Sequence, residues 1–345
     1  MKIISLVLVC VFATFCFVVV LPSLNQTPQS APTHTLLTLW NVDNFPSGKS
    51  SKADWLKKTA LTFEKQNKGV IISVVNLTQQ QAVDLLDQGK TFDLICFSLG
   101  IGNKLLPLLA PYKGKVCSDN NFTLSAVVEN KVYALPFMAG GYCFFARASQ
   151  LKGQFPQDAL NFQQTKKVGK NLVLLDSLHY GTTNTTLVEV ALALTCGKAE
   201  KQNFDQYSTY VDFVRGKFVA LLSTQRDLWR LKQRMTNGKI ENLVFAPCQF
   251  TDLVQYVGVS KQSQQQQIAT EFCQFLQTDV VQQTLVDAGM FSVVGRNDYT
   301  DEWYFQMQEA VNVAKTVSVF CNEEQIAHLK NCAYVGKDTL LDLIA

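Results

Sequence analysis

The sequence lacks the patterns that many enzymes and metal proteins carry. It has no C-x-x-C pair, which argues against a zinc ribbon or a thioredoxin-like redox site. It has no G-x-S-x-G, the turn that presents the nucleophile of α/β-hydrolases. Its histidines are His34, His179 and His328, and none has an acidic residue or a histidine three or four positions later. We therefore expect no metal ion, no cofactor and no enzymatic activity, although a pair of catalytic carboxylates stays open as an alternative.

The chain also lacks a strong excess of either charge. It has 31 Lys and Arg against 28 Asp and Glu, for a net charge of +3. No basic surface of the kind that binds nucleic acid is evident, so we expect no nucleic-acid partner. The stretch "DNFPSGKS" resembles a phosphate-binding loop, but Asp43 occupies the position where that loop needs its first glycine. An acidic side chain there would repel phosphate, so we do not expect nucleotide binding.

One long hydrophobic run is present, and it lies at the N-terminus. After Met1 and Lys2, residues 3–24 carry no charge. About 20 apolar residues cross a bilayer as a helix, and the preceding lysine favours a cytoplasmic N-terminus. We expect an anchor over 1–24 and a polar tether over 25–35, with the rest on the extracellular face of the cytoplasmic membrane. A cleaved signal peptide, which would release the chain, and a lipoprotein signal at Cys10 or Cys16 remain alternatives.

The region after the tether alternates strand and helix patterns. "TLLTLWNV", "VIISVVNL" and "TFDLICFSLG" are rich in strand-forming residues. The segments between them, "SKADWLKKTALTFEKQNKG" and "TQQQAVDLLDQGK", have apolar residues at helical spacing. A βαβαβ order within about 70 residues predicts an α/β fold with a parallel sheet.

Eight cysteines lie outside the N-terminal apolar run. Most are flanked by apolar residues, which is typical of buried thiols. An exported chain could also oxidise some of them, and Cys321 with Cys332 is then the pair we expect to form a disulfide.

Polar and aromatic residues gather where predicted strands end. Ligands of open α/β sheets bind beyond the carboxyl ends of the strands, and aromatic rings offer a flat apolar face to the C–H face of a sugar. The candidate ligand-binding residues are Trp40, Asn41, Asp43, Phe97, Ser98, Phe137, Tyr142, Trp229, Gln249 and Asp252.

The order of these segments resembles the bacterial extracellular solute-binding proteins of sugar-type ABC importers. The resemblance is carried by the first strand, helix and strand, by "FDLICFSLG", by "KVYALPFMAGGYCFFAR", by "FVALLSTQRDLWRLKQR" and by the segment from "FTDLVQYVGVS" to "GMFSVVG". It implies a two-lobed periplasmic-binding-protein-like fold of type 2. Lobe 1 would comprise 36–138 plus 254–300, and lobe 2 would comprise 141–250 plus 301–345.

The resemblance also gives a role to the breakers inside "KVYALPFMAGGYCFFAR". The chain would cross between lobes near 136–143 and again near 249–255. Pro136 would end a strand of one lobe, and Gly140 and Gly141 would supply the backbone freedom of a hinge.

The implied function is capture of a small polar ligand, with a saccharide expected, between two lobes of a monomer. Its partners would be the ligand, the permease of an ABC importer and the membrane that holds the N-terminal helix. The alternative is a membrane-tethered structural or sensory module with a degenerate binding fold and no transported ligand.

Overall fold

The structure is a computed structural model that describes residues 34–114, 116, 120–150, 180–182, 185–199, 206–295, 298–341 and 343–344. The expected anchor over 1–24 and nearly all of the tether lie outside this part of the chain. Within it, none of the helices has the length and apolar character needed to span a bilayer.

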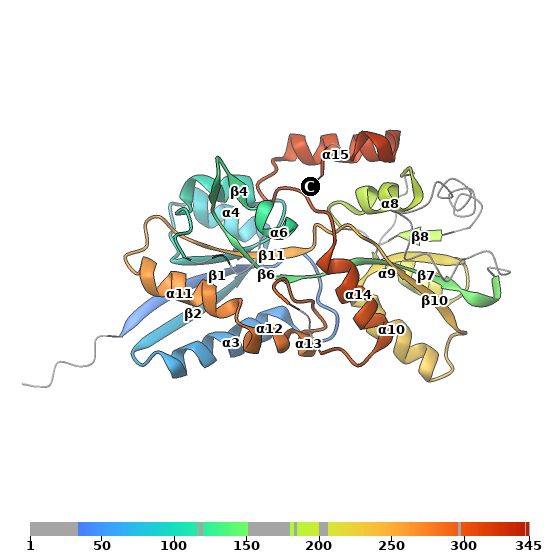
Figure 1. The fold of residues 1–345 in the computed structure, drawn as a ribbon, viewed down its shortest axis with the longest axis horizontal. Coiled ribbons are helices and arrows are strands. Elements are labelled where there is room, and N and C mark those ends of the chain that lie inside the picture. Colours follow the sequence, from blue (N-terminus) through green and yellow to red (C-terminus); the bar gives the residue numbers. More distant parts are fainter. Residues whose placement is uncertain are drawn as a thin grey trace, which may run out of the picture.

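Two β-sheets lie side by side and form the two halves of an elongated molecule (Figure 1). The first sheet has five strands in the order β2-β1-β3-β11-β6. Its strands are β1 (Thr35–Val42), β2 (Val70–Leu77), β3 (Leu94–Phe97), β6 (Leu135–Ala139) and β11 (Val254–Val259). β1 pairs in parallel with β2 and β3, whereas β11 runs antiparallel to both of its neighbours. We call this sheet and the helices on it the first lobe.

The second sheet has four strands in the order β10-β7-β9-β8. Its strands are β7 (Tyr142–Arg147), β8 (Tyr180–Thr182), β9 (Ala220–Thr224) and β10 (Leu243–Pro247). With its helices it forms the second lobe. The predicted α/β fold is thus confirmed as a two-lobed arrangement with one mixed sheet in each lobe. A short hairpin of β4 (Val127–Val128) and β5 (Lys131–Val132) adds to the first lobe.

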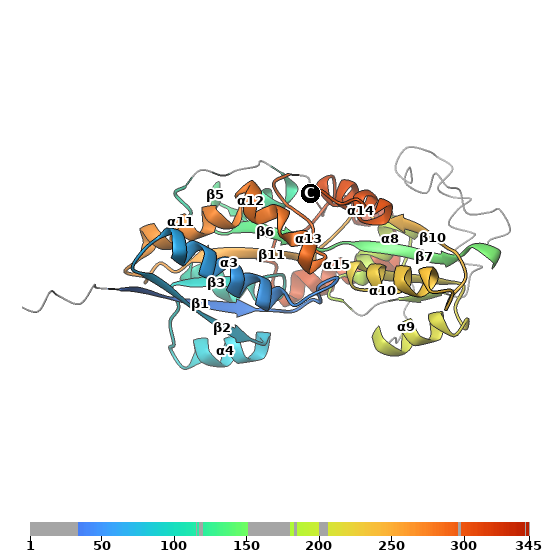
Figure 2. The same cartoon turned by 90° about the horizontal axis from the view of Figure 1, so that it is seen from below.

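Helices cover both sheets, as Figure 2 shows from a second direction. Those of the first lobe are α3 (Lys52–Gln66), α4 (Gln79–Asp87), α5 (Gly102–Leu105), α6 (Asn121–Leu124), α11 (Gln266–Leu276), α12 (Asp279–Gln283) and α13 (Leu285–Ala288). Those packed on the second are α8 (Val188–Cys196), α9 (Gln206–Val214), α10 (Gln225–Thr236), α14 (Glu302–Asn312) and α15 (Glu323–Val335).

Local sequence explains where the first helices begin. Ser51 caps α3 by accepting a hydrogen bond from the backbone N–H of Asp54. Thr78 and Gln81 form a capping box at the start of α4. The apolar face of α3 is buried against the sheet, as the helical spacing of Trp55, Leu56, Ala60 and Phe63 predicts.

The first crossing between the lobes runs from β6 to β7 through Gly140 and Gly141. Pro136 does not end a strand, as we expected, but lies inside β6. β6 is an edge strand and its pairing with β11 is irregular next to Pro136. A proline is tolerated there because one side of the strand needs no ladder hydrogen bond.

The two glycines of this crossing leave room for close packing by the second lobe. Neither has a positive φ in this structure, and their expected role in a hinge stays a prediction. A Cβ atom on Gly140 would lie 2.5 Å from Oε1 of Gln225, and one on Gly141 would lie 2.7 Å from Cε of Met307. Both distances are too short for real contacts, so the second lobe packs directly on a bare backbone.

Two more segments pass between the lobes. The second crossing runs from Pro247, at the end of β10, to Val254, at the start of β11. The chain after α14 then pairs with this segment, because Lys315 N–H donates to Gln249 O over 2.9 Å. Further on, Val319 N–H donates to Ser125 O of the first lobe over 3.1 Å. The stretch between α14 and α15 therefore contacts the first lobe. The predicted division, in which all of 301–345 belongs to the second lobe, does not include this contact.

Six cysteines whose side chains the structure describes are free: Cys96, Cys143, Cys248, Cys273 and Cys321 are buried, and Cys332 is half-buried. The expected bridge from Cys321 to Cys332 is wrong. Cys321 precedes α15 and Cys332 lies near its end, so the helix separates them by about 15 Å at 1.5 Å per residue. A disulfide needs Cα atoms within about 7 Å.

Candidate ligand site between the lobes

The carboxyl ends of β1 and β3 meet at the edge of the first lobe. Asn44 follows β1, and its Nδ2 donates to the backbone oxygen of Leu99 over 2.7 Å. Ser98 follows β3, and its hydroxyl donates to Oδ1 of Asn44. The two loops are thus joined by side chains, as expected for parallel neighbours whose ends share one edge.

A charged pair lies beside these loops. Nζ of Lys52 is 2.6 Å from Oδ1 of Asp43 and 3.3 Å from the centre of the Phe45 ring. The ammonium and the carboxylate form an ion pair at this distance. Lys52 is buried, whereas Asp43 is exposed. Burial lowers the pKa of Lys52 to about 8, and the Asp43 carboxylate opposes this decrease.

A second polar cluster joins the two crossings. The hydroxyl of Tyr142, at the start of β7, donates to Oδ1 of Asp252 over 2.7 Å. The Thr185 hydroxyl lies 2.6 Å from the same Tyr142 oxygen. The Tyr142 ring stacks on Phe250 with centroids 6.3 Å apart. One carboxyl group, two hydroxyls and an aromatic pair therefore meet where the chain passes between the lobes.

Asp252 is nearly inaccessible to solvent, and this burial changes the pKa of its carboxyl group. Burial raises its pKa to about 6, while the hydrogen bond from Tyr142 acts in the opposite direction. Burial, followed by the charge of Asp252, raises the pKa of Tyr142 well above its usual value. The carboxyl group therefore titrates close to neutral pH.

Gln225 connects the lobes directly. It begins α10 in the second lobe and is fully buried. Its Nε2 donates to Pro46 O of the first lobe over 2.7 Å, and its Oε1 accepts from Gly141 N–H over 3.0 Å. The loop after β1, the first crossing and α10 are thus held by one amide group.

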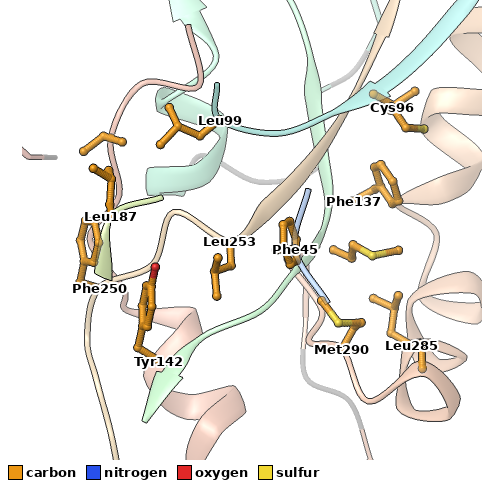
Figure 3. Close-up of a cluster of buried hydrophobic side chains, with 14 of the residues drawn as sticks. Phe45, Cys96, Leu99, Phe137, Tyr142, Leu187, Phe250, Leu253, Leu285 and Met290 are labelled. Atoms are coloured by element: carbon orange, nitrogen blue, oxygen red, sulfur yellow. The ribbon is translucent and has the colours of Figure 1, made fainter. Parts of the chain in front are cut away.

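Apolar side chains fill the space beside these polar groups. Figure 3 shows Phe45 and Leu99 from the first lobe, Tyr142 and Leu187 from the second, and Leu253 from the second crossing. They belong to one buried hydrophobic cluster. The lobes therefore share a continuous core at their junction.

The candidate residues predicted from sequence fall into several groups. Trp40, Phe97 and Phe137 are at most 4% exposed. Trp40 packs on Phe92, Phe97 on Tyr256 and Phe320, and Phe137 on Trp55. These three rings form part of the core and present no free face on which a sugar could stack.

The other predicted residues are distributed differently. Asn41 is buried and donates to Oδ1 of Asn76 over 2.8 Å. Asp43 and Ser98 lie at the edge of the first lobe, and Tyr142 and Asp252 meet at the crossings. Gln249 is half-buried on the second crossing. Trp229 is 44% exposed on α10, one turn after Gln225.

Sequence reasoning missed several residues that complete these clusters. Asn44, Lys52, Thr185 and Gln225 had no pattern of their own. The position of Gln225 could have been recognised from the sequence, because it follows Thr224, which ends a predicted strand and caps the next helix. In the part of the chain that the structure describes, no three His, Cys, Asp or Glu side chains group to hold a metal ion.

The sequence matches no family model and no curated protein. Solved structures do share the fold. The sugar-binding protein MalE from the phytopathogen Xanthomonas citri aligns with a TM-score of 0.59 and 13% identity, covering 87% of this chain and 91% of that one. The GacH receptor of Streptomyces glaucescens, solved without ligand and with acarbose, aligns with a TM-score of 0.55 and 14% identity, covering 87% and 92%.

The same architecture also serves another ligand. Iron-bound HitA from Pseudomonas aeruginosa aligns with a TM-score of 0.55 and 13% identity, covering 86% of this chain and 98% of that one. At such identities the similarity establishes the fold alone. This chain therefore has the two-lobed fold found in extracellular solute-binding proteins, and its own side chains must indicate the ligand.

Proposed function

We propose that this chain is a solute-binding protein that closes its two lobes on a small polar ligand, and that the ligand is a saccharide passed to the permease of an ABC importer. The observation that carries the proposal is the junction itself. Polar side chains of the first lobe (Asp43, Asn44 and Ser98) and of the crossings (Tyr142 and Asp252) lie where the two sheets meet.

The saccharide is favoured by the mixture of groups at this place. Carboxylates, amides and hydroxyls donate and accept hydrogen bonds in the way that sugar hydroxyls require. Trp229 is the candidate aromatic residue that keeps an exposed face. Gln249 on the second crossing and Asn41 near the end of β1 belong to the same proposal. The N-terminal apolar run would hold the protein at the extracellular face of the membrane, or would direct its release.

The hinge belongs to the same proposal. We propose that the lobes rotate about 136–143 and 249–255, with the stretch between α14 and α15 as a third connection. In the closed arrangement the loop after β1 contacts α10, as it does here through the hydrogen bond from Gln225 to Pro46.

A thermal-shift screen of the full chain in mild detergent tests the proposal. The panel contains mono- and oligosaccharides, amino acids, short peptides and ferric iron. We expect a saccharide to raise the melting temperature, and we expect Asn44→Ala to reduce that shift. A shift caused by iron alone would reject the saccharide. No shift with any compound at millimolar concentration would favour the structural or sensory module.

A further inference from the structure

A histidine and a cysteine face each other on the surface of α15. His328 and Cys332 are one helical turn apart, and Nε2 of His328 is 3.7 Å from Sγ of Cys332. His328 is exposed and Cys332 is half-buried. Patterns of acidic or histidine partners around a histidine do not include this cysteine.

The separation of these two atoms suits a tetrahedral metal ion. Zinc binds sulfur at about 2.3 Å and nitrogen at about 2.0–2.1 Å, so two such ligands in a tetrahedron lie about 3.5 Å apart. The observed 3.7 Å differs from this by only about 0.2 Å. Both side chains can therefore reach one ion from their present positions.

The helix holds this pair in place. The backbone oxygen of Cys332 accepts hydrogen bonds from Gly336 N–H over 3.0 Å and from the Thr339 hydroxyl over 2.9 Å. On the inner side, Leu329 and Ala333 are buried and α15 packs on α8. The two ligand atoms thus sit on a rigid element, which favours metal binding because little ordering is needed.

The pair supplies only half of a tetrahedral site. No third His, Cys, Asp or Glu joins it among the residues that the structure describes. Exposed apolar side chains lie in the same part of the chain: Val335 lies one turn further along α15 and is 70% exposed, and Leu341 and Leu343 follow Thr339, whose hydroxyl donates to the Cys332 backbone oxygen. Apolar residues beside an incomplete metal site are suited to contact with another chain.

We propose that His328 and Cys332 form a zinc half-site that is completed by the same pair of a second copy of this chain. Two α15 helices related by a two-fold axis would supply two imidazole nitrogens and two thiolates to one Zn²⁺. Val335, on the next turn of α15, would be covered in the same contact. Each cysteine releases its thiol proton to solvent when it binds, so the affinity rises with pH.

The first test is a titration of the full chain in mild detergent with zinc chloride, under a metal-free reductant. We expect half a zinc ion to bind per chain, as measured with a chromophoric zinc indicator. We also expect the monomer to convert to a dimer, as measured by light scattering. Cobalt(II) is the spectroscopic probe, and thiolate-to-cobalt charge-transfer bands should appear at the same stoichiometry.

Variants separate the site from general metal binding. His328→Ala and Cys332→Ser should each weaken zinc binding at least about tenfold and abolish the dimer, while their melting temperatures without metal stay close to that of the parent chain. His34→Ala and Cys321→Ser are matched controls and should bind zinc normally. Val335→Asp should weaken dimerisation and leave the thiolate–cobalt bands in place at high cobalt concentration.

Two results would overturn the proposal. One is zinc binding that His328→Ala and Cys332→Ser leave unchanged. The other is one zinc ion per chain with no dimer, which would mean that the second copy takes no part. Neither result depends on whether a saccharide binds between the lobes.

Discussion

The hydroxyl of Tyr142 donates a hydrogen bond to Oδ1 of Asp252 over 2.7 Å, and this bond links the first crossing between the lobes to the second. Tyr142 is the first residue of β7, and Asp252 precedes β11. Both side chains are buried. A buried carboxyl group at a proposed hinge is costly to leave without its donor, so this pair is a sensitive point of the fold.

We expect Tyr142→Phe to lower the free energy of unfolding by about 1–3 kcal/mol, because Asp252 would lose a donor that water cannot readily replace. Urea denaturation at neutral pH measures the change. Tyr207→Phe is the matched control, since the Tyr207 ring is exposed, and it should change stability by less than about 0.5 kcal/mol. Equal effects of the two substitutions would show that the bond contributes nothing.

The raised pKa of Asp252 predicts that stability depends on pH. Its folded pKa of about 6 lies above the ordinary value of 3.8, so the folded state holds the proton more tightly than the unfolded state. The stabilisation from this group is complete below about pH 4 and is lost as the pH rises through about 6. Its full size is on the order of 3 kcal/mol, at 1.36 kcal/mol for each pKa unit.

Asp252→Asn isolates this contribution from that of other groups such as Asp227, whose pKa is also raised by burial. The variant has no proton to lose at this position, so its free energy of unfolding should fall less than that of the parent chain between pH 5 and pH 8. Urea melts of both proteins at these two pH values give the difference. Parallel pH profiles would mean that Asp252 keeps an ordinary pKa.

Hydrophobic periodicity predicted the first lobe well. β1 and β2 occupy the predicted segments Thr35–Val42 and Val70–Leu77 from end to end, because period-two alternation and the caps of α3 and α4 are local signals. The fold class followed from the order of the elements. Pro136 was misread because its tolerance depends on β6 being an edge strand, and that is a property of the complete sheet.

The candidate site was harder to predict, since burial depends on tertiary packing. Trp40 and Phe97 stand at strand ends, where ligand residues are common, yet neighbouring helices and loops cover both. Asp252 was identified, but its bond to Tyr142 joins residues 110 positions apart. The zinc half-site on α15 was local and could have been found by including cysteine among the partners of each histidine.

The close packing at the first crossing predicts that it will not accept a larger residue. In Gly140→Ala the new methyl group would displace the Gln225 amide and weaken its bonds to Pro46 and Gly141. We expect a loss of about 1–3 kcal/mol in the free energy of unfolding. Gly295→Ala is the matched control because no atom lies within 4 Å of its Cβ position. A control variant that loses as much as Gly140→Ala would remove steric packing as the explanation.

The two candidate tryptophans should respond in opposite ways to truncation. Trp40 is 4% exposed and packs on Phe92 with ring centroids 5.1 Å apart. Trp40→Ala should therefore cost about 3–5 kcal/mol of stability, as for other core aromatics. Trp229 is 44% exposed, so Trp229→Ala should cost less than about 1 kcal/mol.

Ligand binding then decides what the exposed tryptophan does. If Trp229 stacks on a bound saccharide, Trp229→Ala should weaken binding by about 1–3 kcal/mol, the range for truncation of an aromatic contact. Calorimetric titration with a saccharide found in the thermal-shift screen gives this number, and urea melts of the same samples give the stability. Trp229→Phe keeps an aromatic face and should recover part of the affinity. Unchanged affinity in Trp229→Ala would remove this side chain from the site and leave recognition to the polar edge formed by Asp43, Asn44 and Ser98.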